Sequence, residues 1–384
     1  MDFSLSDTQQ RIVAAIRDMA RKELNGRIYE DDSEARFPIE KWKSVCALDF
    51  LALPVSEEYG GMGESLLTTA LAMKTLAANC KDEGLVFSLC AHLCTCLVPI
   101  SLFGTPSQKR KYLPGLCKGE LIGANGTSEA GAGSDLSLIQ TKVERVAQGY
   151  RLDGSKIFVT NASIADVLII YARHSAGSAG ANLSAFIVDR STPGIGLGQT
   201  WKKMGLRTSP MSEMTFDDCR VGEDARLGRE RFGLAMFNRS MIWERVLMAA
   251  YHIGAMELQF NEALDYSNSR SQFGSRIGKF QMVAEKLVKM RVGIEAAKAL
   301  LYQTCWKLDQ GCERTSDASI LKLVASEAKV ANSLDAVQIF GAYGFMKESL
   351  VEKQLRDSIG ARIYSGTTEI QKKLIADELE RVDE

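Results

Sequence analysis

The stretch TSEAGAGSD, residues 127–135, decides the fold, because the hydrophobic pattern changes there from helical to β-type. Its glycines allow a backbone to approach a flat or charged ligand closely, and Ser128 and Ser134 add hydroxyl groups. The glycine spacing matches neither the phosphate-binding P-loop nor the G-x-G-x-x-G turn of dinucleotide-binding folds. In isolation an ordinary tight turn explains the stretch equally well, so its meaning depends on the sequence around it.

The residues before this stretch have helical periodicity. Ser6 and Gln9 form a capping box, and the apolar residues that follow recur at helical spacing. The glycines of EEYGGMGES predict a loop, and Thr105 followed by Pro106 predicts the start of another helix. Residues 1–120 are therefore expected to form an N-terminal helical domain.

The residues after the stretch have β-type patterns. KVERVAQGYRLDGSKIFVTNA predicts two strands around a turn, and DVLIIYAR, LSAFIVD and EMTFDDCRV are short strand-like runs. No helical crossover separates these runs, which favours an antiparallel barrel or sandwich over a Rossmann sheet. Helical periodicity returns from Gly233. The expected fold class is a multidomain α+β protein, with a middle β-barrel domain at residues 121–230 and a C-terminal helical bundle at residues 231–384.

The composition is that of an ordinary globular protein, with 46% hydrophobic and 25% charged residues among 384. A formal net charge of −1 gives no support to nucleic-acid binding through bulk charge. No apolar run is expected to reach the ~20 residues that cross a bilayer, and MDFSLSDTQQ lacks the basic and apolar blocks of a signal peptide. We expect no membrane association and a cytoplasmic location.

The nine cysteines are expected to be free and mostly buried, because the chain is large and no export signal is recognised. The segment CAHLCTC suggests a metal site through Cys90, His92, Cys94 and Cys96. On a helix, however, Cys90 and Cys94 share one face while His92 and Cys96 share another, and the C-x₂-C spacing of zinc sites is absent. We therefore expect a core helix of small residues and no metal site.

A second stretch, SMIWERVLMAAYHIGAM at residues 240–256, places Glu244 and Arg245 inside an apolar helical run. Glu244 shares its helical face with apolar side chains, where a carboxylate is costly unless it is paired, exposed or needed. In one interpretation this part of the helix lies near water, or an arginine pairs with Glu244. In the other, Glu244 is a base whose pKa is raised by apolar surroundings. On this stretch alone the first interpretation is favoured.

Each of these motifs is weak evidence alone, but their order along the chain indicates a protein family. TSEAGAGSD is followed by KIFVTNA, KMGLRTSPMSEMTFDDCRV, SRSQFG, QIFGAYGF and IYSGTTEIQ, and this succession closely resembles the acyl-CoA dehydrogenase family over nearly the whole chain. The resemblance implies a helical domain, a β-barrel and a four-helix bundle, assembled as a homotetramer. It also implies FAD bound between the β-domain and the bundle, in a site that a neighbouring subunit completes.

The resemblance assigns roles to individual positions. For the flavin it implies residues of the β-domain and of the last turn of the chain: Thr127, Ser128, Gly133, Ser134, Phe158, Thr160, Thr367 and Glu369. For the FAD of the partner subunit or its adenosine part it implies residues of the bundle: Arg270, Phe273, Gln281, Gln338 and Gly341. The implied substrate contacts are Ser134, Tyr364 and Ser365. Phe158 stands where Trp is frequent and Ala342 replaces a frequent glycine, so both depart from the family pattern.

The catalytic base is displaced from its usual position. Many family members carry it in a Y-E-G-T turn, where this chain has Ser365, and a hydroxyl cannot replace a carboxylate as a base at neutral pH. A minority branch, which includes isovaleryl-CoA dehydrogenases, supplies the base from a helix with a motif such as LERLVLAAG. WERVLMAAYHIG resembles that motif and now favours Glu244 as the base. The implied reaction removes the Cα proton of a thioester and transfers hydride to flavin N5, while a ribityl hydroxyl and the Glu369 N–H polarise the carbonyl.

A narrower resemblance concerns the substrate. VFSLCAHLCTCLVPISLFG, ASIADVLIIYA, SMIWERV, CWKLDQG and RIYSGTTEIQKKLIA resemble the prolyl-carrier-protein dehydrogenases and oxidases of natural-product pathways. The implied partner is an acyl or peptidyl carrier protein that bears L-proline as a thioester on its phosphopantetheine arm, and the implied product is a pyrroline or pyrrolyl thioester. The alternatives are α,β-dehydrogenation of a short or branched acyl-CoA, or a degenerate, non-catalytic member, which the hydroxyl at Ser365 favours.

Three features stay open at this point. The oxidation removes either two or four electrons, and the electron acceptor is either dioxygen or an electron-transfer flavoprotein. Lys109, Arg110 and Lys111 form a basic cluster that either meets an acidic carrier protein or, in the favoured interpretation, is a solvated helix face.

Overall fold

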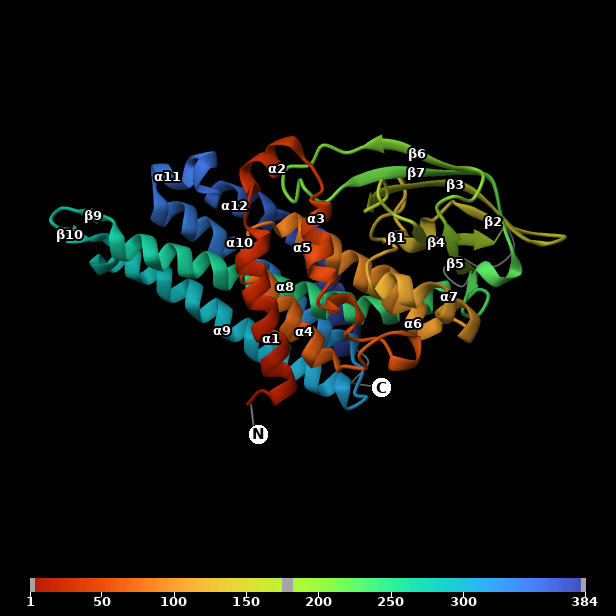
Figure 1. The fold of residues 1–384 in the computed structure, drawn as a ribbon, viewed down its shortest axis with the longest axis horizontal. Coiled ribbons are helices and arrows are strands. Elements are labelled where there is room, and N and C mark those ends of the chain that lie inside the picture. The colour runs from red at the N-terminus through yellow and green to blue at the C-terminus, as the bar shows by residue number, and fades with distance from the viewer. Residues whose placement is uncertain (1–3, 175–181, 381–384) are drawn as a thin grey trace.

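The computed structural model describes residues 4–174 and 182–380. Figure 1 shows the first helices at the centre, the β-sheet at one end of the long axis and an arm of long helices reaching to the other end. The predicted order of helices, then strands, then helices is confirmed. The sheet and the tip of the arm therefore lie far apart within one chain.

The first part of the chain consists of short helices. They are α1 (Asp7–Met19), α2 (Ile28–Glu34), α3 (Ile39–Cys46), α4 (Leu66–Ala77), α5 (Glu83–His92), α6 (Val98–Phe103) and α7 (Pro106–Cys117), with the π-helical segment η4 (Leu93–Leu97) between α5 and α6. The capping box of Ser6 and Gln9 is confirmed at the start of α1. Thr105 caps α7 and Pro106 occupies its first turn, as predicted.

The helical segment Glu83–Phe103 corrects the expectation that no apolar run reaches membrane-spanning length. It has 21 residues, and in the part of the chain that the structure describes it is the one helix long and apolar enough to cross a bilayer. In the structure, 83% of its most apolar window is buried inside the protein, where it packs against α8 (Gly233–Ser269). Its apolar character is therefore explained by burial in the core.

The two helix faces predicted for CAHLCTC are confirmed. The sulfur atoms of Cys90 and Cys94 lie 3.8 Å apart on one side. On another side, His92 Nδ1 accepts a hydrogen bond of 2.8 Å from the backbone N–H of Gly123, against which Cys96 also packs. These side chains therefore do not converge on one point.

The middle part of the chain forms an eight-stranded sheet with the order β6-β7-β3-β2-β4-β5-β8, and β1 beside β4. The strands are β1 (Gly123–Gly126), β2 (Lys142–Val146), β3 (Gly149–Thr160), β4 (Val167–His174), β5 (Leu183–Asp189), β6 (Ile195–Thr200), β7 (Met211–Val221) and β8 (Arg226–Leu227). The predicted hairpin of β2 and β3 is confirmed. The expected antiparallel pairing is confirmed for most neighbouring strands, but β4 runs parallel to β1 and β2. The chain reverses after β3, but β4 lies on the far side of β2 and so runs in its direction.

The last part of the chain is a bundle of long helices. It contains α8, α9 (Gln281–Asp309), α10 (Thr315–Phe340), α11 (Ala342–Phe345), α12 (Val351–Ile359) and α13 (Thr368–Leu379), with the hairpin of β9 (Ser271–Gln272) and β10 (Ser275–Arg276) after α8. Helix α8 packs against α4, α9 and α10. The largest apolar core takes residues from the first helices, from β4 and β5 and from the bundle. This core is shared by residues on both sides of the expected domain limits near 120 and 230. A shared core does not test where one domain ends and the next begins, so these limits remain predictions.

Candidate active site

Glu244 lies on the central helix α8, and its carboxylate meets the turn that precedes α13. The hydroxyl of Ser365 donates a hydrogen bond of 2.6 Å to Glu244 Oε1. The Glu244 side chain is only partly accessible, and burial raises the pKa of its carboxyl above the ordinary glutamate value. The hydrogen bond from Ser365 and the raised pKa favour the second interpretation, in which Glu244 is a base, and this role stays a prediction.

The turn before α13 is held from two helices. Ser365 and Gly366 have positive φ angles of 59° and 86°. Gln371 on α13 donates from Nε2 to the carbonyl oxygens of Ser365 at 3.0 Å and Gly366 at 2.9 Å. Lys322 on α10 donates from Nζ to the carbonyl of Gly366 at 2.8 Å, and Thr367 is the N-cap of α13. The Ser365 hydroxyl is thus presented to Glu244 by a fixed backbone.

Two buried cations lie close to the Glu244 carboxylate. Arg245 is 4% exposed, and its Nε and Nη1 have no hydrogen-bond partner among the residues described. Burial lowers the pKa of Arg245 to about 10, and burial followed by the charge of Arg245 lowers the pKa of Lys322 to about 8. Both positive charges act against burial and favour the ionised form of Glu244. Lys322 was missed in the sequence, where a lysine on the apolar face of SILKLVASEAK was the available signal.

Tyr364, an implied substrate contact, is held by a histidine and a phenylalanine. Its hydroxyl lies 2.9 Å from His252 Nε2, and its ring centroid lies 4.7 Å from that of Phe87. Burial, followed by the charge of Lys329, lowers the pKa of His252 well below its ordinary value, so the imidazole is neutral. His252 was not a sequence candidate, although its position two helical turns after Glu244 was a signal.

A buried ion pair anchors the glycine-rich loop to the sheet. Lys156 on β3 donates from Nζ to Glu129 Oε1 at 2.7 Å and to the carbonyl of Thr127 at 3.2 Å. Glu129 also accepts from the backbone N–H groups of Gln140 at 2.6 Å and Thr141 at 2.9 Å. The sequence indicated neither member of this pair, because their proximity depends on the fold.

The outer part of the loop presents an open backbone. Gly133 and Ser134 are exposed, and a Cβ added at Gly133 would meet no atom within 4 Å. The backbone carbonyl of Ser128 accepts a hydrogen bond from the backbone N–H of Ile157 on β3. The Ser128 hydroxyl takes no part in this backbone pairing. The hydroxyl of Thr127, however, donates to the Asn125 side chain, so Asn125 is a neighbour of the site that the sequence did not indicate.

Phe158 and Thr160 lie at the end of β3, where the pairing with β7 is irregular. Phe158 has a φ of 56° and is 53% exposed, although a large apolar side chain rarely adopts either state. Its ring lies 5.3 Å from Trp201, a residue that the sequence did not single out. Thr160 is half-buried beside them. The arrangement keeps an aromatic face available to a ligand.

The segment η4 joins the β-domain residues to Glu244. Asn125 on β1 donates to the carbonyl of Thr95 at 3.1 Å. The adjacent Cys94 has a raised pKa, for which burial is the main cause, Cys90 the next and the charge of Glu244 the smallest. Strand β1, which leads into the glycine-rich loop, and helix α8, which carries Glu244, therefore both pack against the same helical segment, which π-helical geometry distorts at this point.

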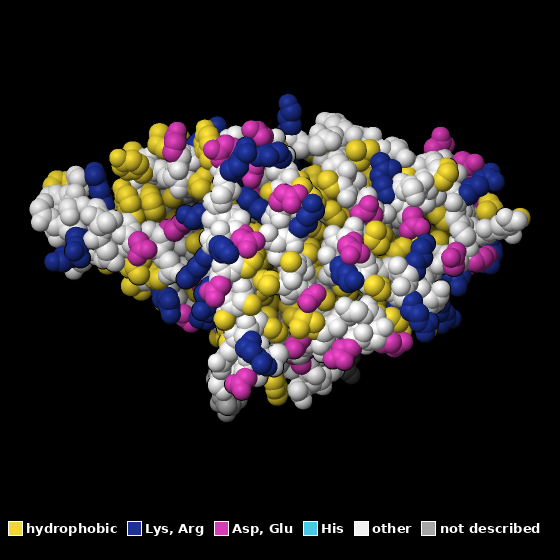
Figure 2. Space-filling model, viewed as in Figure 1, with side chains coloured by type: hydrophobic (Ala, Val, Ile, Leu, Met, Phe, Trp, Pro, Cys, Tyr) yellow, Lys and Arg dark blue, Asp and Glu magenta, His cyan; other side chains and the backbone are white. Residues whose placement is uncertain are grey.

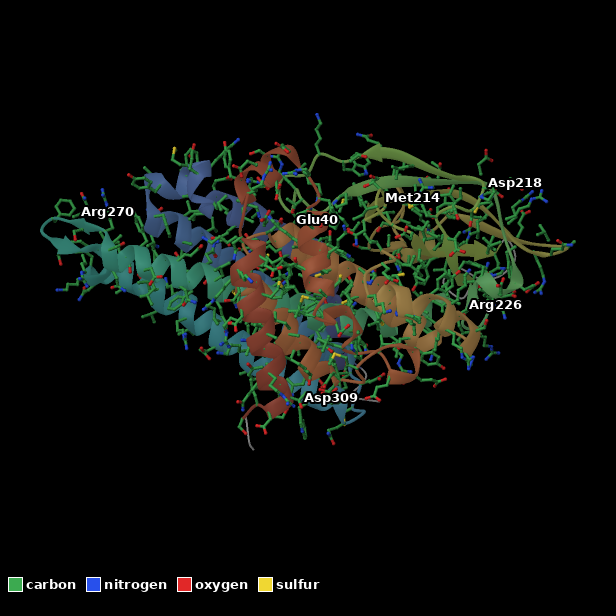
Figure 3. All side chains as sticks on the ribbon, in the orientation of Figure 1. Glu40, Met214, Asp218, Arg226, Arg270 and Asp309 are labelled. Atoms are coloured by element: carbon green, nitrogen blue, oxygen red, sulfur yellow. The ribbon has the colours of Figure 1, made fainter. Side chains whose placement is uncertain are left out.

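The other implied cofactor residues lie elsewhere in the chain. Arg270, Phe273, Gln281, Gln338 and Gly341 lie at the tip of the helical arm, and all five are exposed. Figure 3 places Arg270 at the opposite end of the molecule from the sheet residues Met214, Asp218 and Arg226. Phe273 is 96% exposed and has a φ of 49°. One copy of the chain does not bring this group to Glu244.

Three family models match successive parts of the chain. The N-terminal domain of acyl-CoA dehydrogenase matches residues 6–120, its middle domain residues 124–219 and its C-terminal domain residues 232–380. The chain therefore belongs to the acyl-CoA dehydrogenase family and is an oxidoreductase with the fold of that family. The resemblance found in the sequence is confirmed.

Individual relatives are similar over the full length. An L-prolyl-[peptidyl-carrier protein] dehydrogenase of Pseudomonas fluorescens is 40% identical, over 99% of this chain and 100% of that protein. The prolyl acyl carrier protein oxidase AnaB has a TM-score of 0.96 at 38% identity, over 98% of this chain and 100% of AnaB. The structure described as PigA with FAD and proline has a TM-score of 0.96 at 39% identity, over 99% of both chains.

Proposed function

We propose that this protein binds FAD and oxidises an L-prolyl thioester on an acyl or peptidyl carrier protein to a dehydroprolyl thioester. The observation that carries the proposal is the contact between the Glu244 carboxylate and Ser365. It brings a carboxylate with a raised pKa to the turn where the family pattern expects the base. The full-length similarity to prolyl-carrier-protein enzymes supports proline as the carried group.

The residues around the site have the features that a flavin requires. Phe158 offers an exposed aromatic face, and the backbone at Gly133 is open to close approach. Thr367 caps α13, whose first N–H groups can donate to an anion or a carbonyl oxygen. Bound FAD would supply the hydride acceptor of the reaction. The similarity to the structure of PigA with FAD and proline supports this cofactor.

Glu244 performs the proton transfer in this proposal. Its carboxylate takes the Cα proton of the thioester, and the pKa raised by burial strengthens it as a base towards a carbon acid. Ser365, Arg245 and Lys322 oppose this shift of the pKa and favour the ionised carboxylate. The Glu369 N–H is the proposed donor to the thioester carbonyl. The pKa of the exposed Glu369 carboxyl is lowered, chiefly by its own backbone N–H, so this N–H already favours negative charge beside it.

The substrate is tested by mass spectrometry. The purified yellow protein is incubated with prolyl-loaded carrier protein, and we expect the carrier to lose about 2 or about 4 Da as hydrogen pairs are removed. The size of the loss also separates two-electron from four-electron oxidation. Repeating the assay with and without dioxygen, and with an electron-transfer flavoprotein, identifies the electron acceptor.

Two controls separate the alternatives. If the carrier keeps its mass while isovaleryl-CoA or butyryl-CoA bleaches the flavin, the protein is an acyl-CoA dehydrogenase and the prolyl proposal is wrong. If the protein stays colourless after incubation with FAD, the degenerate, non-catalytic interpretation is favoured instead. Carrier protein loaded with alanine controls for the ring of proline.

Assembly as a homotetramer completes the proposed cofactor site. Tyr343 and Phe345 on α11 are exposed, and Figure 2 shows hydrophobic side chains gathered over α11 at the end of the molecule that carries the arm. Exposed apolar side chains of this size favour contact with another chain. Arg270 and Phe273 would then reach the FAD of a partner subunit, which explains their separation from Glu244 within one chain.

Removing the two side chains at the tip of the arm tests this assembly. In Arg270→Ala we expect the Kd for FAD to rise about tenfold or more, because a charge-assisted hydrogen bond contributes about 1.5–3 kcal/mol. In Phe273→Ala we expect the Kd to rise through the loss of an apolar contact. FAD retention and native mass are measured after gel filtration. Arg220→Ala, on the exposed surface of β7, is the matched control. Unchanged FAD retention in both variants would show that the arm does not contribute to the cofactor site.

The basic residues of α7 already contact other side chains of the same chain. Lys111 pairs with Asp189 at 2.9 Å, Arg110 lies 3.9 Å from Glu58, and Lys109 lies over the ring of Tyr59. These contacts support the interpretation as a solvated helix face. We propose a cytoplasmic location, which the nine free cysteines support because free thiols persist in reducing compartments.

A further inference from the structure

We propose that Ser365 is a positioning residue for the base: its hydroxyl engages Glu244 Oε1, so that Oε2 is the oxygen left to accept the substrate proton. The inference rests on the proposed function and adds to it a role for a residue of the chain that cannot itself act as a base. In the family pattern this position carries the catalytic carboxylate. Here it contacts the carboxylate that has replaced it.

The contact has the geometry of a strong hydrogen bond. The distance from Ser365 Oγ to Glu244 Oε1 is 2.6 Å, within the range of hydroxyl-to-carboxylate bonds. The described residues give Oε2 no hydrogen bond, and the Glu244 side chain remains partly accessible. One oxygen is therefore occupied and the other is available.

The backbone at Ser365 is kept in an unfavourable conformation. Its φ of 59° lies in the left-handed region, which costs a residue with a Cβ on the order of 1–2 kcal/mol. Gln371 holds the carbonyls of Ser365 and Gly366, and Lys322 holds that of Gly366 from another helix. A glycine would occupy this position without strain, yet the chain has a serine. The hydroxyl is the feature that compensates for the strain.

The charged and titratable groups around Glu244 determine how much the Ser365 hydrogen bond changes the pKa of Glu244. Arg245 on α8 and Lys322 on α10 lower the pKa of Glu244, while Tyr171 on β4 and Cys94 on η4 face it as neutral groups whose own pKa values are raised, mainly by burial. The Ser365 hydrogen bond is the largest of the influences that oppose burial. Removing it should therefore raise the pKa of the base.

Two substitutions isolate the hydroxyl from the backbone. Ser365→Gly removes the hydroxyl and the strain together, and Ser365→Ala removes the hydroxyl and keeps the strain. In both we expect the pKa of Glu244 to rise by about one unit, which corresponds to a tenfold change in the ionised fraction at low pH. Ser358→Ala is the matched control, because the buried Ser358 hydroxyl donates only to Leu355 of its own helix.

The pKa of Glu244 is measured in two independent ways on the FAD-loaded protein. Infrared difference spectra against Glu244→Gln follow the protonated carboxyl as the pH changes and need no substrate. The pH profile of flavin reduction by prolyl-carrier protein gives the pKa of Glu244 during the reaction. In the Ser365 variants its acidic limb should shift to higher pH, and at pH values below the limb the rate should be about tenfold lower than in the wild type.

The outcomes distinguish this inference from the proposed function. If both variants leave the infrared pKa unchanged, or if Ser358→Ala moves it equally, Ser365 does not position the base. If the wild-type protein oxidises no prolyl or acyl thioester, the proposed function fails, while the infrared measurement still decides whether Ser365 controls Glu244. A raised infrared pKa in both Ser365 variants and an unchanged one in Ser358→Ala support the inference.

Discussion

Glu244→Gln is expected to lower thioester oxidation by on the order of 10³-fold while the protein remains yellow, because a general base contributes about 10²–10⁴-fold. Glutamine keeps the volume of the side chain and can still accept the Ser365 hydrogen bond, but it cannot take a proton from carbon. The measurement is the rate of flavin reduction by prolyl-carrier protein in single-turnover experiments. The loss should appear in that step, with FAD binding unchanged.

Stability provides an internal check on this variant. Burial raises the pKa of Glu244, so the folded state favours the protonated form and the ionised carboxylate costs stability at neutral pH. Glutamine removes that cost, and the free energy of unfolding should stay the same or increase. Glu257→Gln, on the same helix in an ion pair with Lys74, is the matched control. Retained turnover in Glu244→Gln would remove Glu244 from the mechanism.

The fold was largely predictable because its elements have strong local patterns. Helical periodicity and a capping box fixed α1, and alternating apolar residues fixed the β2–β3 hairpin. The parallel pairing of β4 was not predictable from local pattern, since the neighbour of a strand depends on the path of the whole chain. The core helix expected around residues 90–96 is confirmed by its burial, but the apolar length of the segment Glu83–Phe103 was underestimated.

The site was predictable only where a motif carried it. The resemblance indicated Glu244 as the base and drew attention to Ser365, but it did not indicate that the two side chains touch. Lys322 on α10 meets the carbonyl of Gly366, and His252, on the same helix as Glu244, meets Tyr364. Their positions in the sequence were signals, but the partners that they contact depend on the fold. Residues that support a site from another element are found when the fold places them, which is why sequence motifs describe this site incompletely.

The buried pair of Lys156 and Glu129 is expected to control both stability and the glycine-rich loop. In Lys156→Met we expect the free energy of unfolding to fall by about 3–5 kcal/mol, because removal of one partner leaves an uncompensated buried charge. Lys156 Nζ is fully buried, and it also holds the carbonyl of Thr127. Release of that carbonyl should loosen the loop and weaken FAD binding. Urea denaturation measures the first effect, and flavin fluorescence on dilution measures the second.

The charge itself can be separated from the lost packing. Burial opposes ionisation of Glu129, but the charge and hydrogen bond of Lys156 outweigh it and lower the pKa of Glu129. The stabilising contribution is therefore present at neutral pH and is lost as the pH falls through that lowered pKa. Adding Glu129→Gln to Lys156→Met removes the uncompensated charge, so the double variant should regain part of the stability. Lys286→Met, which breaks a more exposed pair with Asp335, should cost only about 0–1 kcal/mol. If Lys156→Met costs no more than this control, the ion pair does not hold the loop, and the anchoring must come from the backbone contacts of Glu129 alone.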